Sequence, residues 1–199
     1  MKTWFLALAL ISTSLISCAQ DSTLPAAQRS GGMPLMEALS NRKTTREFDE
    51  NKQLTNQQLA DLLWAACGFN REDKLTIPTA LNRQEITVYA IMPDGAYRYD
   101  ARNNVLVQVN DQDVRQSAGA QEFAQKAWLN IAIVSDKSKM EHDIFAGVAV
   151  GAVMQNIYLW CASNGIGTVA RGSFDGEVLA KELKLNENQR VMLVQTVGY

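Results

Sequence analysis

The sequence has one histidine, three cysteines and four prolines among 199 residues, and it has no excess of positive charge. Its 19 Lys and Arg are outnumbered by 21 Asp and Glu, which argues against a nucleic-acid-binding protein, because that class needs a concentrated basic face. The cysteine and histidine spacing offers no metal motif. Cys67 and Cys161 lie in apolar helical contexts. Such a pair can form a disulfide in an oxidising compartment, but two buried free thiols are the more usual case. His142 lies at the start of a predicted helix, which favours a surface position over catalysis.

Long apolar runs are scarce too, and the first is at the N-terminus. Lys2 precedes an apolar stretch from Trp4 to Ile16 that is too short to span a bilayer, which is the pattern of an export signal. Leu15-Ile16-Ser17-Cys18 resembles a bacterial lipobox and predicts a lipoprotein signal peptide over residues 1–17, with lipidation of Cys18. The alternative is ordinary signal cleavage after Ala19. Both predict an exported protein, and the lipobox predicts a bacterial cell-envelope lipoprotein that is membrane-anchored through lipid only.

The remaining chain predicts a tether followed by one domain. Residues 18–34 are rich in Ser, Pro and Gly and predict a lipidated Cys on a flexible tether, with the folded domain over residues 35–199. We expect helices near residues 35–39, 55–68, 113–127, 140–163 and 178–185, and strands near 86–92, 97–99, 105–109, 131–134 and 191–197. Because strands and helices do not alternate strictly, the pattern favours an α+β sandwich over a doubly wound sheet.

The second long apolar run lies in the predicted helix at residues 140–163. The stretch from Ile144 to Val153 could be taken for a membrane span, but Gln155 and Asn156 interrupt it early and favour a buried helix. Gly147-x-x-x-Gly151 allows close backbone approach, which suits the centre of a core or a dimer interface.

Positive charge is concentrated at one place, Arg42-Lys43-Thr44-Thr45-Arg46. Guanidinium and ammonium groups beside hydroxyls are suited to hold a phosphate, although such a cluster can also be a solvated basic turn. Two loops offer further ligand-binding groups. Pro78 to Gln84 carries a hydroxyl and two amides, and the small residues of Gly165 to Phe174 expose backbone N–H groups; each alone is also an ordinary connection.

Taken in order, these segments resemble the nitroreductase family of FMN-dependent oxidoreductases, over essentially the whole of residues 35–199. The basic cluster with its following Glu47-Phe48 is similar to the family's opening motif. The loop Pro78-Thr79-Ala80-Leu81-Asn82-x-Gln84 is similar to one that meets FMN from the partner subunit in the family. Gly119-Ala120-Gln121 resembles a flavin-facing loop. The run Val88 to Ile91 and the segment Gly95 to Asp100 resemble, in particular, the branch of azoline dehydrogenases that form thiazoles and oxazoles.

This resemblance implies a homodimer with a mostly antiparallel central sheet, flanking helices and the long central helix at the dimer interface. It implies FMN as cofactor, a small-molecule substrate and no catalytic side chain, since the flavin carries the hydride. The residues that it assigns to FMN are Arg42, Lys43, Thr44, Arg46, Pro78, Thr79, Ala80, Asn82, Gln121, Ala170, Arg171, Gly172 and Ser173. Arg171 departs from the family, which commonly has a small or apolar residue there.

The predicted compartment affects the predicted reaction. NAD(P)H is not expected outside the cytoplasm, so the resemblance implies either another electron donor or a substrate that itself supplies the hydride. The alternative function is a non-enzymatic ligand-binding or envelope-interaction module that retains the fold.

Overall fold

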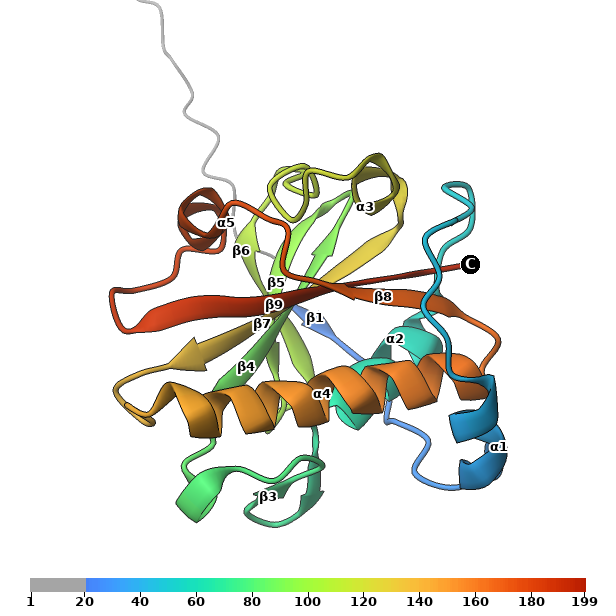
Figure 1. Cartoon of the computed structure of the whole chain (residues 1–199), viewed down its shortest axis with the longest axis horizontal. Coiled ribbons are helices and arrows are strands. Elements are labelled where there is room, and N and C mark those ends of the chain that lie inside the picture. Colours follow the sequence, from blue (N-terminus) through green and yellow to red (C-terminus); the bar gives the residue numbers. More distant parts are fainter. Residues whose placement is uncertain (1–20) are drawn as a thin grey trace, which may run out of the picture.

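The computed structural model describes residues 21–199, which form an α+β domain around a seven-stranded sheet with every neighbouring pair antiparallel (Figure 1). The strand order is β1-β6-β5-β4-β7-β9-β8. The strands are β1 (Ser22–Thr23), β4 (Ile86–Met92), β5 (Gly95–Asp100), β6 (Val105–Asn110), β7 (Leu129–Asp136), β8 (Gly167–Arg171) and β9 (Gln189–Gly198), with β2 (Phe69–Arg71) and β3 (Lys74–Leu75) as a separate hairpin. The predicted fold class is confirmed.

Helices cover both faces of the sheet. The helices are α1 (Leu35–Asn41), α2 (Asn56–Cys67), α3 (Glu122–Lys126), α4 (Asp143–Ser163) and α5 (Gly176–Glu182), and a short 3₁₀ turn, η1, spans Ala80–Asn82. The larger hydrophobic core joins α2 and α4 to alternate residues of β4 and β7, such as Val88 and Ile131. The residues between them on these strands, such as Tyr89 and Ala132, face the opposite side and pack with Leu179 of α5. The period-2 alternation of the strands thus builds two cores.

Helix α2 forms where its capping signals predict. The Thr55 side chain accepts from the Gln58 backbone N–H at 3.2 Å, while the Gln58 side chain accepts from the Thr55 N–H at 2.9 Å. This reciprocal pair satisfies two of the N–H groups that a helix start leaves without intrahelical partners. The helix ends at Gly68, where a Cβ would lie 2.7 Å from the Trp64 carbonyl oxygen, so the stop requires glycine.

The helix predicted over residues 113–127 is wrong for most of its length. Only Glu122–Lys126 is α-helical, and the residues before it form turns. Asp113 accepts hydrogen bonds from the backbone N–H and the guanidinium of Arg115, at 3.1 and 2.9 Å. A side chain that bonds its neighbouring backbone in this way competes with helix formation.

Residues 21–34 are docked on the domain where a flexible tether was expected. Ser22 and Thr23 pair with β6, and Leu24 is buried in the larger core. Asn104 donates to the carbonyls of Leu24 and Pro25, at 3.1 and 2.9 Å. The folded domain therefore begins at about residue 22, because these backbone groups and one apolar side chain have partners there. The predicted signal peptide and Cys18 lie outside the described residues.

Helix α4 is buried on one side only. By length and composition it could cross a membrane, a test that core helices of soluble proteins also pass. Its inward side chains, including Val153 and Ile157, pack in the larger core, whereas Ile144, Phe145 and Val148 are exposed. At Gly147 and Gly151 an added Cβ would meet no atom within 4 Å. The expected burial is thus confirmed for one side of α4 only, and an apolar face is left uncovered.

Candidate functional site

The basic cluster lies where α1 ends, beside the C-terminal half of α4 (Figure 1). Arg42 caps α1, with its N–H bonded to the Ala38 carbonyl, and its guanidinium carbon lies 5.1 Å from the centre of the Tyr158 ring. Stacking of a guanidinium on an aromatic face is attractive and fixes the direction of the charge. Lys43 and Arg46 are exposed.

The hydroxyl of Tyr158 joins the cluster to β8. It accepts from the backbone N–H of Ala170 at 3.1 Å and is hydrogen-bonded to Thr44 Oγ1 at 3.1 Å. Thr45 strengthens this link, because its N–H donates to the Thr168 carbonyl at 3.0 Å. Tyr158 therefore brings together three of the residues that the resemblance assigned to one site, namely Arg42, Thr44 and Ala170.

A cavity of about 1100 Å³ lies at one end of α4 and one of about 730 Å³ at the other. The smaller is lined by Arg42, Lys43, Tyr158 and Gly165–Thr168, and its volume is in the usual range for small-molecule sites. The absence of a side chain at Gly167 lets Thr45 and Gly198 approach closely. A Cβ there would lie 3.0 Å from Thr45 Cγ2 and 3.2 Å from the Gly198 carbonyl oxygen.

β8 is an edge strand of the described sheet, paired only with β9. Along its unpaired edge the Thr168 carbonyl and the Ala170 N–H are used by Thr45 and Tyr158. Gly172 directly follows Arg171, the last residue of β8. Gly172 and Ser173 are exposed, so this stretch offers backbone groups to a ligand.

Arg171 points away from that edge into the protein and is 5% exposed. Its Nε donates to Thr196 Oγ1 at 3.0 Å and its Nη2 to Asn130 Oδ1 at 2.9 Å. Burial lowers the pKa of Arg171 from 12.5 to about 10, so the guanidinium stays protonated at neutral pH. It therefore brings a buried positive charge, and no surface-exposed one, to the site.

The segment that carries Gln121 reaches the same region. Gln121 is exposed and is the N-cap of α3, while Phe123 packs against Phe48 with ring centres 6.0 Å apart. Phe48 follows the basic cluster and also lies against Gly198 of β9. The segments 42–48, 119–123 and 167–173 thus converge at one end of the sheet.

The loop Pro78 to Asn82 lies at the other end of α4 (Figure 1). Helix α4 has 21 residues and so spans roughly 30 Å, which keeps this loop from the Arg42 cluster within one protomer. The loop is rigidly shaped: Thr79 Oγ1 accepts from the Gln84 N–H at 3.1 Å, and Asn82 donates to the Asp73 carbonyl at 3.2 Å. Leu81 and Asn82 have φ of 52° and 55°, a region that side-chain-bearing residues rarely adopt.

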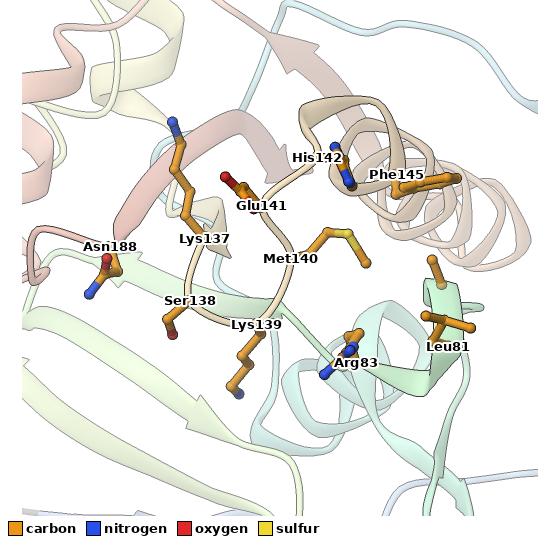
Figure 2. A pocket seen from close by; sticks show the side chains of 11 residues that line it. Leu81, Arg83, Lys137, Ser138, Lys139, Met140, Glu141, His142, Phe145 and Asn188 are labelled. Carbon is orange, nitrogen blue, oxygen red and sulfur yellow. The ribbon is translucent and has the colours of Figure 1, made fainter.

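The larger hollow lies beside this loop (Figure 2). Met140, Phe145 and Leu81 form its apolar side, and Leu81 is 85% exposed. Lys137 and Lys139 point to opposite sides of the hollow, so these two cations do not converge on one point (Figure 2). His142 is exposed there as expected, and its ring makes a T-shaped contact with that of Phe145 at 6.0 Å between the ring centres.

The thiols of Cys67 and Cys161 are free and buried, so that of the two alternatives for this pair the unpaired one is confirmed. Burial raises the pKa of Cys67 to about 12 and that of Cys161 above its ordinary value. Both thiols therefore stay protonated and unreactive at neutral pH.

Comparison with known proteins identifies the family. The family model described as "Nitroreductase family" matches residues 39–199. The chain belongs to the nitroreductase family. The matched residues include the basic cluster, the Pro78 loop and the β8 edge, so the predicted resemblance to the nitroreductase family is confirmed.

Solved structures agree with the family assignment. A crystal structure of a Ralstonia eutropha protein named as a nitroreductase is 36% identical, with a TM-score of 0.84, over 99% of this chain and 95% of that one. A chain of the Escherichia coli microcin synthetase McbBCD complex shares the fold at 15% identity, with a TM-score of 0.69, over 99% and 84%. A protein from Desulfovibrio desulfuricans named as a nitroreductase, solved in complex with FMN, shares the fold at 18% identity, with a TM-score of 0.64, over 84% and 87%.

Sequence reasoning missed Tyr158 in this nitroreductase-family site. Tyr158 lies in an otherwise apolar helix and is 7% exposed, so in the sequence it has the character of a core aromatic. Its one distinguishing signal is the hydroxyl, because a buried tyrosine hydroxyl usually finds a hydrogen-bond partner.

Proposed function

We propose that this nitroreductase-family protein is an FMN-dependent oxidoreductase whose flavin lies along the unpaired edge of β8. The observation that carries the proposal is the Tyr158 hydroxyl, which couples Thr44, next to Arg42 and Lys43, to the backbone of Ala170. The cavity wall then supplies cations for a phosphate at Arg42 and Lys43, and the end of β8 supplies backbone groups for a ring. The Desulfovibrio relative with bound FMN supports the choice of cofactor.

The residues present fit such a group. Arg42 and Lys43 line the 730 Å³ cavity and supply charge-assisted donors for a phosphate, and Thr44 adds a hydroxyl beside them. The backbone N–H of the exposed Gly172 would be a donor for a flavin ring nitrogen, and Gln121 and Ser173 flank the same region. Bound FMN would supply the hydride-transfer chemistry, while the chain binds the cofactor, orients it and limits access to it.

We propose that a second copy completes the site. Pro78, Thr79, Ala80 and Asn82 lie at the opposite end of α4 from Arg42, beyond the reach of a flavin bound there. Two copies that pack their α4 helices antiparallel would bring the Pro78 loop of one to the Arg42 cluster of the other. The exposed apolar side chains Ile144, Phe145 and Val148 support this face as the contact.

The proposed substrate is a small molecule, and we place the protein with the azoline-dehydrogenase-like branch. The support is the segment from Val88 to Asp100, which forms the β4–β5 hairpin, together with the shared fold of the microcin synthetase chain. A dehydrogenase direction also suits an exported protein, because the substrate then supplies the hydride and no free nicotinamide is needed.

We propose in addition that the protein is exported and lipidated on Cys18, as a bacterial envelope lipoprotein. The support is the sequence alone: the charged and apolar start of the chain followed by Leu15-Ile16-Ser17-Cys18. The domain then works on the far side of the cytoplasmic membrane from the NAD(P)H pool.

The cofactor is tested by titrating the full chain, purified in detergent, with FMN and recording visible absorbance. Wild type should bind saturably, and Arg42→Ala should bind at least roughly tenfold more weakly, because a charge-assisted hydrogen bond contributes about 1.5–3 kcal/mol. The exposed residue Arg71 supplies the matched control, Arg71→Ala, which should bind like wild type. A colourless wild type that binds no FMN would leave the non-enzymatic module as the better description.

A further inference from the structure

The Arg171 guanidinium is a buried charge without a countercharge. It is 5% exposed, and no carboxylate of residues 21–199 lies within ion-pair distance of it. Buried charges are normally paired, because removal from water is costly and hydrogen bonds to neutral groups return only part of that cost. Burial lowers its pKa to about 10 and leaves it charged at neutral pH.

Its hydrogen-bond partners are all neutral and all fixed. Thr196 Oγ1 accepts from Nε and in turn donates to Asn130 Oδ1 at 2.7 Å, and the same Asn130 oxygen accepts from Nη2 at 2.9 Å. The Asn130 amide is held by the Ala124 carbonyl at 2.7 Å. The guanidinium is therefore oriented by a closed network rather than left free to turn toward water.

The chain around it is shaped to admit it. At Gly119 an added Cβ would collide with Arg171 Nη1, so this segment can approach only as glycine. Phe123 lies with its ring centre 5.9 Å from the guanidinium carbon, and the Ser173 carbonyl accepts from Nη1 at 3.4 Å. Both sides of the cradle, Gly119–Phe123 and Ser173, belong to the segments that meet at the proposed flavin site.

We propose that Arg171 is a positioning residue that supplies a fixed positive charge behind the β8 edge, so that the site prefers the reduced, anionic form of FMN to the oxidised form. This inference rests on the proposed function, which puts the flavin against Gly172 and Ser173. Uptake of two electrons and one proton adds one negative charge to the ring, and that charge is the missing partner of the guanidinium. The electric field of a preoriented buried group stabilises the new charge on the ring without any rearrangement of the protein.

The experiment compares full-length wild type with Arg171→Gln and Arg171→Lys, using FMN as the probe. Dissociation constants are measured for oxidised FMN and, anaerobically with dithionite as electron source, for reduced FMN. In Arg171→Gln the preference for reduced over oxidised FMN should fall at least tenfold, which lowers the midpoint potential of the bound flavin by about 30 mV for a two-electron couple. Arg171→Lys keeps the charge and should keep most of the preference.

The exposed Arg71 gives the matched control, Arg71→Gln, whose preference should equal that of wild type. A purely structural role for Arg171 would weaken both forms equally, so an unchanged ratio in Arg171→Gln overturns the inference while the proposed function stands. If Arg171→Gln does not fold, wild type decides: a bound potential below that of free FMN overturns the inference, and one above it supports it. Wild type that binds no FMN overturns the proposed function and with it this inference.

Discussion

At the scale of single residues, Tyr158 organises the site although the sequence gives little sign of it. The Arg42 guanidinium stacks on its ring, and its hydroxyl is hydrogen-bonded to both Thr44 and the Ala170 N–H. The basic cluster could be predicted, since cations and hydroxyls were adjacent in the chain. Tyr158 could not, because its role depends on residues 114 positions before it and 12 after it, which only the fold brings together.

Removing this hydroxyl gives a residue-scale prediction. Tyr158→Phe leaves the partly buried Ala170 N–H without its partner and should lower the free energy of unfolding by about 1–2 kcal/mol in urea titrations. FMN affinity should fall with it, since Tyr158 no longer holds the Ala170 N–H and Thr44 in place. Tyr97→Phe is the control, because its hydroxyl makes long contacts of 3.4 Å. Equal urea midpoints for Tyr158→Phe and wild type would contradict the role given to the hydroxyl.

At the scale of elements, the sequence predicts best where local signals and burial agree. The capping box of α2 and the alternating strands β4 and β7 form as expected. The stretch 113–121 fails because its helical composition is outweighed by the local bonds of Asp113 to Arg115 and by Gly119, which has to admit a side chain from a distant strand. That constraint comes from Arg171, 52 residues later in the numbering, and no local pattern contains it.

Helix α4 carries the element-scale prediction. Val148→Glu puts a charge on its 63% exposed apolar face, and it should weaken the proposed homodimer on the order of a hundredfold, because a buried unpaired carboxylate is costly. Light scattering over a concentration series measures the change. Val178→Glu, on the exposed surface of α5 at 43% exposure, is the matched control and should leave the mass unchanged. A Val148→Glu protein that stays as dimeric as this control would rule out the α4 face as the contact.

At the scale of the whole molecule, the domain fold follows from one chain but the proposed site does not. The Arg42 cluster and the Pro78 loop can both be predicted from the sequence as ligand-binding segments. Within one protomer, however, they lie beside opposite ends of α4, a helix of 21 residues. Residues of two copies that form one site leave no periodicity or spacing that a single sequence could display. The contact between two copies is indicated by the uncovered apolar face of α4 and by the Gly147-x-x-x-Gly151 spacing on that helix.

Export also concerns the whole molecule, and Cys18→Ser tests it. Wild type expressed in a bacterial host should incorporate labelled fatty acid and sediment with membranes, whereas Cys18→Ser should do neither, since acylation needs the thiol. Cys67→Ala, which removes a buried free cysteine, is the control and should remain labelled. A mature wild-type chain that starts at Gln20 and carries no lipid would instead support ordinary cleavage after Ala19.

The docking of residues 22–25 on β6 sets the geometry of such an anchor. Cys18 and Ser22 are four residue steps apart in the chain, a reach of roughly 14 Å at full extension, so a lipid there would hold the β1 edge close to the bilayer surface. The strand order puts β8 at the opposite edge of the sheet, six strand spacings or roughly 29 Å away. The short link between Cys18 and β1 would therefore direct the β8 edge, where the flavin is proposed to bind, away from the lipid and toward dissolved substrates.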